Sequence, residues 1–561
     1  MILSRTPTRT RTRSAFAAAL LLAAAGLSAA AVPAGAAAAA PGPYSYGVAV
    51  APPTPAKSAN RSAYESSVEP SIGAEWKSGL TAYQADLGTY FVRFDDSTRP
   101  ARATWTERSP GSSATTLDPI LYTDNAGTPA VPTSSRTIVS QLSGPTSLSS
   151  VTDDAGATYT PSTGGNSSGV DHQGIGGGPY VTGSAFALAG TYPASGPKRA
   201  IYYCSQQIIG SFCTRSDNGG ILYGDPVVAY TASSGATDGC QGLHGHPRVR
   251  PDGVLLLPNK NCGKVPGSLP GAVGNHQAVN TNTDSNATPA GWSIDIIPDS
   301  TNGITDPSVA ADAANTEYFG YGNGDGHPKV AVKTKNGSWS ASVDLGALVP
   351  GAPVVQTVFP DVVTGSAGRA AVAFLGSTTP TTTTTTGAKI TGVDTGFQGI
   401  WQVYIARTSD SGATWSVQQV TTDTAFPVQK GCLQLGGTCR HRNLYDFNDI
   451  TVDQLGRVEY GFADGCFKQS DGSTKGCSDG SGAAGSANDP ADGTHVGSIA
   501  RQDCGPSLFA EQDAALAAVC ASAQSTDPSA SLPEAPSLPL LAGAGALAGA
   551  AMLTLRRRRR A

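Results

Sequence analysis

The sequence T-S-D-S-G-A-T-W, from Thr408 to Trp415, occurs in related form at two other places in the chain. T-D-D-A-G-A-T-Y runs from Thr152 to Tyr159, and S-D-N-G-G-I-L-Y runs from Ser216 to Tyr223. The first two fit the pattern S/T-x-D-x-G-x-T-aromatic at each fixed position. Such a pattern predicts a tight turn between two strands, because the carboxylate accepts backbone N–H groups and glycine adopts a φ that other residues resist.

We interpret the residues of these turns as structural rather than catalytic. Asp154 and Asp410 tie the turn, and the aromatic residue that follows restarts the strand and packs beneath the loop. The turn residues assigned in this way are Thr152, Asp154, Gly156, Thr158, Tyr159, Asp217, Gly219, Thr408, Asp410, Gly412, Thr414 and Trp415.

A second repeat consists of short strands that begin with an acidic residue or histidine, often next to proline. Its copies start at Glu69, Asp118, Asp171, His246, Asp306, Asp361 and Asp449. Spacings of about 50 to 90 residues are those of four-stranded blades joined by loops of variable length. The sequence therefore predicts an all-β protein, a β-propeller of seven blades rather than six.

The composition agrees with this fold class and excludes one class of partner. Charged residues make up 14% of the chain, Gly and Pro number 68 and 39, and the formal net charge is −5. Many turns and few charges favour an all-β body. Basic runs occur only in the terminal segments, so we expect no nucleic-acid binding.

Both ends of the chain read as export signals. Residues 1–40 combine four arginines with an apolar run and A-x-A sites, which predicts a secretory signal peptide. Residues 41–520 form the predicted propeller and residues 521–537 a Ser/Ala/Pro linker. Residues 538–561 are apolar and end in five arginines, which predicts a single C-terminal membrane anchor on a Gram-positive-type cell surface; whether the anchor is retained is left open.

The ten cysteines fall in pairs that are close in sequence. In an exported protein an even number usually indicates disulfides. The predicted pairs are Cys204/Cys213, Cys240/Cys262, Cys432/Cys439, Cys466/Cys477 and Cys504/Cys520. The alternative for Cys432/Cys439 is a metal site, which no second Cys/His pair at zinc-like spacing supports apart from His441.

The candidate site follows from the predicted geometry, because inner strands of a propeller converge on its axis. Carboxylates crowded there raise one another's pKa unless a cation or a basic side chain intervenes. We assign candidate catalytic roles to Asp171, His172, His246 and Asp446. Candidate ligand-binding residues are Glu69, Asp118, His244, Asp306, Asp325, His327, Arg442 and Asp449. The alternative is that an Asp near Pro only caps the turn before its strand.

The turn motifs, together with G-V-D-H-Q, G-L-H-G-H, G-N-G-D-G-H-P and R-N-L-Y-D-F-N-D, resemble those of bacterial sialidase-like exported proteins with BNR (Asp-box) repeats. The resemblance implies a propeller fold and action on glycans. The three arginines and the Tyr/Glu pair of active sialidases have no counterpart by motif, so only the fold carries over. Arg93, Arg248 and Arg442 are the arginines available for an acidic sugar.

Two hypotheses about function remain. The first is a surface glycoside hydrolase with a carboxylate- and histidine-lined central pocket. The second is a non-catalytic propeller that binds a glycan, a protein or a cation. We expect a glycan or glycoprotein partner and a monomer. No cofactor is required by either reading, although Ca²⁺ is compatible with the carboxylates.

Overall fold

The computed structural model describes most of the predicted propeller. The described residues are 44–52, 67–113, 118–143, 146–165, 171–207, 210–231, 240, 242–262, 276–285, 291–433, 435, 438–439, 444, 446–468, 474–475 and 495–525. The predicted signal peptide, the membrane anchor, Arg442 and Cys477 lie outside them. Within them, no helix is both long enough and apolar enough to span a bilayer.

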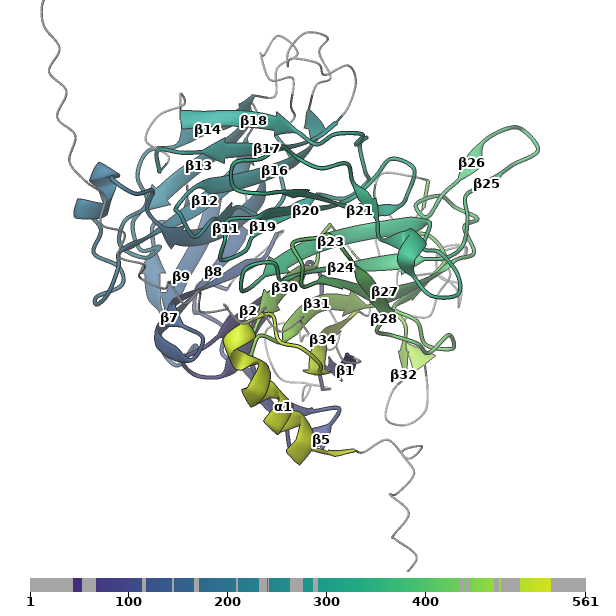
Figure 1. The fold of residues 1–561 in the computed structure, drawn as a ribbon, viewed down its shortest axis with the longest axis horizontal. Coiled ribbons are helices and arrows are strands. Elements are labelled where there is room, and N and C mark those ends of the chain that lie inside the picture. Colours follow the sequence, from purple (N-terminus) through teal and green to yellow (C-terminus); the bar gives the residue numbers. More distant parts are fainter. Residues whose placement is uncertain are drawn as a thin grey trace, which may run out of the picture. The chain divides into compact units, whose positions relative to one another are not determined.

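The described strands form seven four-stranded antiparallel sheets, which we number as blades one to seven (Figure 1). Blade one contains β2 (Ser71–Glu75), β3 (Leu80–Ala85), β4 (Gly88–Asp95) and β6 (Arg102–Glu107). Blade two contains β7 (Ile120–Thr128), β8 (Val131–Ser143), β9 (Thr146–Thr152) and β10 (Thr160–Ser162). Blade three contains β11 (Asp171–Pro179), β12 (Arg199–Gln207), β13 (Gly210–Ser216) and β14 (Val227–Thr231). Blade four contains β15 (Arg248–Val249), β16 (Leu255–Cys262), β17 (His276–Asn282) and β18 (Trp292–Ile296).

The remaining blades follow the same order. Blade five contains β19 (Ser308–Ala311), β20 (Glu317–Gly322), β21 (Pro328–Lys333) and β22 (Val343–Asp344). Blade six contains β23 (Gln356–Thr364), β24 (Ala370–Ser377), β27 (Ile400–Thr408) and β28 (Ser416–Gln419), with β29 (Gln429–Lys430) paired to β27. Blade seven contains β30 (Asp449–Val452), β31 (Val458–Asp464), β34 (Val496–Cys504) and β1 (Ser45–Val50).

Short elements lie outside this pattern. They are the pairs β5 (Thr98–Arg99) with β35 (Gln524–Ser525), β25 (Thr382–Thr383) with β26 (Lys389–Ile390), and β32 (Phe467–Lys468) with β33 (Thr474–Lys475). The helical turns are η1 (Ala185–Leu188), η3 (Gly346–Leu348) and η5 (Ala510–Gln512), and the one described α-helix is α1 (Asp513–Ser522).

The innermost strand of each blade contacts the innermost strands of its two neighbours, and the ring closes through β30 and β2. This confirms the predicted seven-bladed propeller. Strand β1, the first described strand, is the outermost strand of blade seven and pairs with β34, so blade seven combines strands from the beginning and the end of the described propeller. Aromatic side chains such as Tyr83, Tyr318 and Phe374 are fully buried between the sheets, as expected for an all-β core.

Two of the three predicted turns have the expected structure. Asp410 accepts hydrogen bonds from the backbone N–H and the hydroxyl of Thr414, and Gly412 has φ 82°. Asp154 accepts from the same groups of Thr158 at 2.8 and 2.7 Å. Both turns join the third and fourth strands of a blade, as a peripheral structural role requires.

The assignment of the third turn is wrong by one residue. Asn218, not Asp217, accepts the N–H of Leu222 at 2.9 Å, and Gly220 is the position whose N–H bonds to Ser216. Asp217 instead pairs with Arg215 at 2.8 Å and accepts the hydroxyl of Tyr180. An amide oxygen serves the turn as well as a carboxylate does, which leaves the charged side chain free for these other bonds.

Four of the five predicted disulfides are present among the described residues: Cys204–Cys213, Cys240–Cys262, Cys432–Cys439 and Cys504–Cys520. The fifth, Cys466–Cys477, falls on Cys477, outside the described residues. Disulfides in this number are typical of extracellular proteins. The Cys504–Cys520 bond fastens α1 to β34, and β35 then pairs with β5, the short strand between β4 and β6 in the sequence. The described fold thus continues a few residues beyond position 520.

Candidate functional site

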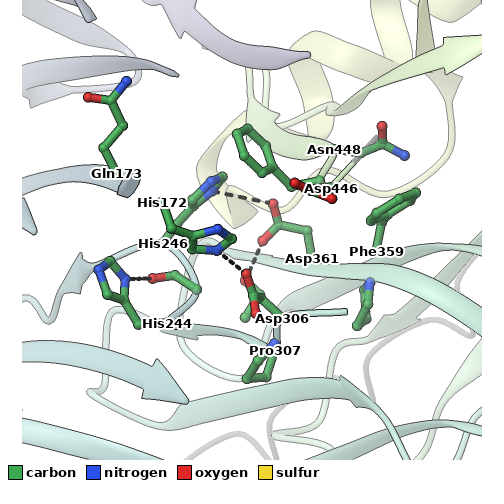
Figure 2. A pocket seen from close by; sticks show the side chains of 14 residues that line it. His172, Gln173, His244, His246, Asp306, Pro307, Phe359, Asp361, Asp446 and Asn448 are labelled. Carbon is green, nitrogen blue, oxygen red and sulfur yellow. Dashed lines mark hydrogen bonds and ion pairs between the residues drawn. The ribbon is translucent and has the colours of Figure 1, made fainter. Parts of the chain in front are cut away.

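The starts of the inner strands meet around a small axial pocket with a volume of about 30 Å³. The pocket is lined by His172, Gln173, His244, Gly245, His246, Asp306, Pro307, Ser308, Phe359, Pro360, Asp361, Asp446, Phe447 and Asn448. Figure 2 shows the imidazole rings of His172 and His246 close to the carboxylates of Asp306 and Asp361, with Gln173 to one side. A volume of this size is enough for an ion or a water molecule but not for a sugar ring.

His246, Asp361 and Asp449 form a cluster that we call the axial triad; one potential ligand atom from each residue lies within 4.8 Å of the others. Nδ1 of His246 is 3.5 Å from Oδ1 of Asp449 and 4.0 Å from Oδ2 of Asp361. Both aspartates are nearly fully buried. Asp449 comes from blade seven, Asp361 from blade six and His246 from the loop before blade four, so the triad depends on the closed ring.

The two carboxylates of the axial triad differ in their surroundings. Oδ2 of Asp449 accepts the hydroxyl of Ser71 at 2.8 Å, and Nη2 of Arg248 lies 3.3 Å from Oδ1. Oδ1 of Asp361 accepts the hydroxyl of Ser308, but its buried Oδ2 has no hydrogen-bond partner among the described residues. A buried carboxylate oxygen without a partner is costly, which makes this position suited to a cation.

The pKa values of these aspartates move in opposite directions. Burial, followed by the neighbouring Asp449 carboxylate, raises the pKa of Asp361 to about 6. Burial also acts to raise the pKa of Asp449, but His246 and Arg248 outweigh it and hold that pKa well below its usual range. One carboxyl group of the pair is therefore ionised at neutral pH with support from the protein, while the other resists ionisation in the absence of a further cation.

A second ion pair lies beside the axial triad. Nε2 of His172 contacts Oδ2 of Asp306, and Nζ of Lys260 lies 3.1 Å from Oδ1 of the same residue. Burial acts to lower the pKa of His172, but the Asp306 carboxylate raises it to about 9. Asp306 therefore has its counter-charges from within the protein and is not a candidate ligand for a cation.

His244 has the arrangement of a neutral imidazole with an available nitrogen. Its Nδ1 lies 2.8 Å from the carbonyl oxygen of Gly245, and its Nε2 is buried with no partner among the described residues. Burial and the nearby His172 lower the pKa of His244 to about 4. Because an N–H bonded to a carbonyl fixes the tautomer, Nε2 carries a lone pair, as metal-binding histidines require.

The backbone at the pocket departs from regular strand geometry. His172 and Phe359 have φ values of 47° and 53°, and β-bulges interrupt the pairing between Asp171 and Gly174 and between Val358 and Asp361. Positive φ is unfavourable for a bulky residue such as Phe, and deviations of this kind gather at binding sites. The bulge in β23 places Asp361 inside its strand rather than at the strand start that the sequence predicts.

The geometry of the axial triad fits a divalent cation. With metal–ligand distances of about 2.0–2.2 Å, the 3.5 Å between His246 and Asp449 subtends an angle of about 110° at the ion, close to tetrahedral. The 4.0 Å between His246 and Asp361 subtends a wider angle, so a tetrahedral ion needs Asp361 to move inward. Three protein ligands leave other coordination positions for water or for an incoming ligand. One imidazole with two carboxylates suits ions such as Mn²⁺ or Zn²⁺ better than Ca²⁺, which prefers oxygen ligands throughout.

The sequence-predicted residues divide into two groups. His172, His244, His246, Asp306 and Asp446 line the axial pocket, and Asp449 joins it through the triad. Asp171 is the first residue of β11, whereas Glu69 and Asp118 lie just before β2 and β7. None of the three is among the lining residues of the axial pocket. Asp118 accepts the N–H of His172 at 3.0 Å, and burial raises its pKa to about 6. Asp118 therefore does not line the pocket itself but holds the backbone of His172, which does.

Asp325 and His327 do not join the pocket. They belong to the turn between β20 and β21, where Asp325 accepts the N–H of His327 and pairs with Lys329 at 3.1 Å, while His327 pairs with Asp344 at 2.7 Å. These bonds satisfy the turn locally, so the prediction that both residues bind a ligand with the others is not supported by their position. Arg442 lies outside the described residues.

Sequence reasoning missed Lys260 and Phe447. Lys260 comes from the second strand of blade four, where no motif distinguishes it, yet it completes the ion pair with Asp306. The ring of Phe447 lies 5.6 Å from that of His246 and 6.1 Å from that of His172, and it forms one wall of the pocket. The sequence signal for Phe447 was its position directly after the candidate residue Asp446.

No protein-family model matches the sequence, and no curated protein does either. Solved structures similar to this one include a protein of unknown function from Dyadobacter fermentans, with 10% identity over 81% of this chain and 97% of that chain and a TM-score of 0.36. AofleA from Arthrobotrys oligospora shares 11% identity over 68% of this chain and 91% of that chain, with a TM-score of 0.36.

A lectin from Aleuria aurantia, solved with α-methyl-L-fucoside, shares 12% identity over 63% of this chain and 89% of that chain, with a TM-score of 0.33. Scores this low carry no information about function. The protein is thus defined by its own structure, as a seven-bladed β-propeller with an axial pocket of histidines and carboxylates.

Proposed function

We propose that this protein binds a divalent cation at His246, Asp361 and Asp449 and uses the ion to hold an oxygen-rich ligand, such as a glycan, at the mouth of the propeller channel. The observation that carries the proposal is Oδ2 of Asp361, which is buried without a hydrogen-bond partner among the described residues and lies 4.0 Å from Nδ1 of His246. A cation between these atoms satisfies both and neutralises the adjacent carboxylates.

The class of ligand follows from what the ion leaves open. The pocket of about 30 Å³ admits an ion but no sugar ring, so a larger ligand stays outside and donates oxygen atoms to the free coordination positions. Neighbouring hydroxyl groups or a carboxylate of a glycan are suited to this. We expect Mn²⁺ and Zn²⁺ to bind more tightly than Ca²⁺, because one of the three ligands is a histidine nitrogen.

A glycoside hydrolase is the second candidate. It is favoured by the oxygens of Asp361 and Asp449, which lie within 4.8 Å of each other, close to the carboxylate separation of retaining glycosidases. Sialidase activity in particular needs arginines around the substrate carboxylate, and the described lining of the axial pocket contains none. A hydrolase reading therefore points to neutral glycosides.

Calorimetric titration of the purified, metal-stripped protein with Mn²⁺, Zn²⁺ and Ca²⁺ tests the proposal. We expect one site per chain, with the transition-metal ions binding more tightly than Ca²⁺, and we expect Asp361→Asn to lose most of that affinity. Asp325→Asn, in the β20–β21 turn, is the matched control and should bind as the parent does. Equal binding by Asp361→Asn and the parent would contradict the proposal.

Turnover of neutral and sialylated fluorogenic glycosides, with and without Mn²⁺, separates the two candidates. Metal binding without turnover supports a binding protein. Turnover of a neutral glycoside that disappears in Asp361→Asn, but persists without metal, would favour the hydrolase.

A further inference from the structure

A larger axial cavity, with a volume of about 290 Å³, lies along the inner strands next to the axial triad. We call it the channel cavity. Aliphatic side chains such as Ile72, Leu121 and Val362 form part of its wall. The polar lining residues are Tyr122, Thr123, Asn125, Thr364 and Thr451, together with the carboxylate of Asp449. Its volume is near the lower end of the range for small-molecule pockets.

Two arginines, Arg199 and Arg248, line the channel cavity and keep 21% and 20% of their side-chain surfaces exposed. They are its only cationic lining residues among those described. Guanidinium groups in a cavity of mixed aliphatic and polar lining are suited to binding a planar carboxylate.

The two arginines differ in how their charge is balanced. Arg199 donates two hydrogen bonds of 2.7 Å to the fully buried carboxylate of Asp124, which compensates it completely. Arg248 has one described carboxylate within ion-pair distance, that of Asp449, at 3.3 Å. Since Asp449 is also a member of the axial triad, Arg248 shares its counter-charge with the proposed cation.

A count of formal charges shows what cation binding does to the channel cavity. A divalent ion is balanced by the two carboxylates of the axial triad, which leaves the charge of Arg248 without a counter-ion beside the partly aliphatic channel cavity. A positive charge in such surroundings favours an anion next to it. One monoanion in the channel cavity restores neutrality.

From this arrangement we infer that the channel cavity binds the carboxylate of a compact organic monoacid through Arg248, and that a cation in the axial triad strengthens this binding. Arg199 supplies a second guanidinium, whose charge is already balanced by Asp124. The aliphatic part of the wall accommodates the apolar body of the acid. The coupling rests on the proposed cation site, whereas the cavity and its two arginines do not.

Calorimetric titration with benzoate, using benzyl alcohol as the uncharged match, tests this inference in the presence and absence of saturating Mn²⁺. We expect benzoate to bind more tightly than benzyl alcohol, and at least fivefold more tightly with Mn²⁺ than without it. Saturating benzoate must increase the affinity for Mn²⁺ by the same factor, because coupling between two sites is reciprocal.

Variants at Arg248 show whether the coupling runs through this residue. Arg248→Gln should lose the benzoate preference and the coupling, whereas Arg248→Lys, which keeps the charge, should retain part of both. Near-ultraviolet circular dichroism verifies that both variants are folded.

The results for the two sites can be told apart. Normal Mn²⁺ binding with equal affinities for benzoate and benzyl alcohol would overturn the inference and leave the cation proposal standing. Absence of Mn²⁺ binding, with benzoate still bound through Arg248, would overturn the cation proposal and the coupling but support the carboxylate site.

Discussion

The hydroxyl of Ser71 donates a 2.8 Å hydrogen bond to Oδ2 of Asp449, although 378 positions of the sequence separate the two residues. Ser71 is the first residue of the inner strand of blade one, and Asp449 is the first residue of the inner strand of blade seven. The backbone N–H of Ile72 bonds to the same oxygen at 3.2 Å. Closure of the propeller ring therefore also orients a carboxylate of the proposed cation site.

Ser71→Ala should weaken cation binding by about tenfold or more, because hydrogen bonds to charged groups contribute about 1.5–3 kcal/mol. The expected cause is a carboxylate that loses its fixed orientation. Mn²⁺ titration measures the effect, and urea unfolding separates it from a loss of stability. Ser78→Ala is a matched control, since its hydroxyl bonds to Glu75 at the other end of β2. Equal Mn²⁺ affinities for the two variants would contradict this role of Ser71.

Asp410→Ala should lower the free energy of unfolding by about 1–2 kcal/mol and leave Mn²⁺ affinity unchanged. Its carboxylate accepts three groups of one turn, the hydroxyl of Thr408 and the N–H and hydroxyl of Thr414, far along blade six from the axis. Chemical denaturation checks the first expectation and calorimetry the second. The exposed Asp225→Ala is the control. A loss of metal binding in Asp410→Ala would show that these turns do more than hold the blade.

The sequence was sufficient for the architecture because each blade repeats a local signal. Asp or His near Pro marks the inner strand, and the turn motif marks its outer edge, so seven starts could be counted without knowing how the blades meet. Asn218 was missed because an amide oxygen replaces a carboxylate without changing the turn, and the pattern favoured the aspartate beside it.

The site was less predictable because it depends on distances between blades. Convergence on the axis brought His246 and Asp449 together, but pairing Asp306 with Lys260 needs the register of β16 against its neighbours. Asp325 and His327 resemble the pocket residues in type and in their Gly-rich context, yet bonds to Lys329 and Asp344 keep them in their own turn. Residue type alone does not separate these cases.

Replacing Cys504 and Cys520 with serine should destabilise the protein by about 3 kcal/mol, the loop-closure effect expected for a separation of 16 residues. The bond fastens α1 to β34, and α1 also meets blade six through Arg369 and Asp513, whose Nη2 and Oδ2 atoms are 2.8 Å apart. Differential scanning calorimetry measures the change. The Cys432/Cys439 pair closes a separation of 7 residues, so the matching double variant should lose less, about 2.4 kcal/mol. The reverse order would contradict the explanation by loop length.

Asp464 should make the protein less stable as the pH rises. Burial raises the pKa of Asp464 from 3.8 to about 8, with one opposing hydrogen bond from the N–H of Cys466. Between these two values the folded chain holds a proton that the unfolded chain has lost, so the free energy of unfolding falls with increasing pH. The largest slope from one such group is about 1.4 kcal/mol per pH unit. The stabilising contribution is complete below about pH 4 and is lost by about pH 8.

Asp464→Asn removes this titration while keeping an oxygen that accepts the N–H of Cys466. Tyr83 is a titratable neighbour whose pKa is raised by burial, so it stays neutral over the whole window. We therefore expect the variant to gain stability relative to the parent as the pH rises from 5 to 8, measured by urea unfolding at several pH values. Taking the difference between the two proteins cancels the contributions of other groups, and Asp225→Asn controls for the loss of one surface charge. A difference that does not change with pH would show that Asp464 is ionised in the folded protein at pH 5.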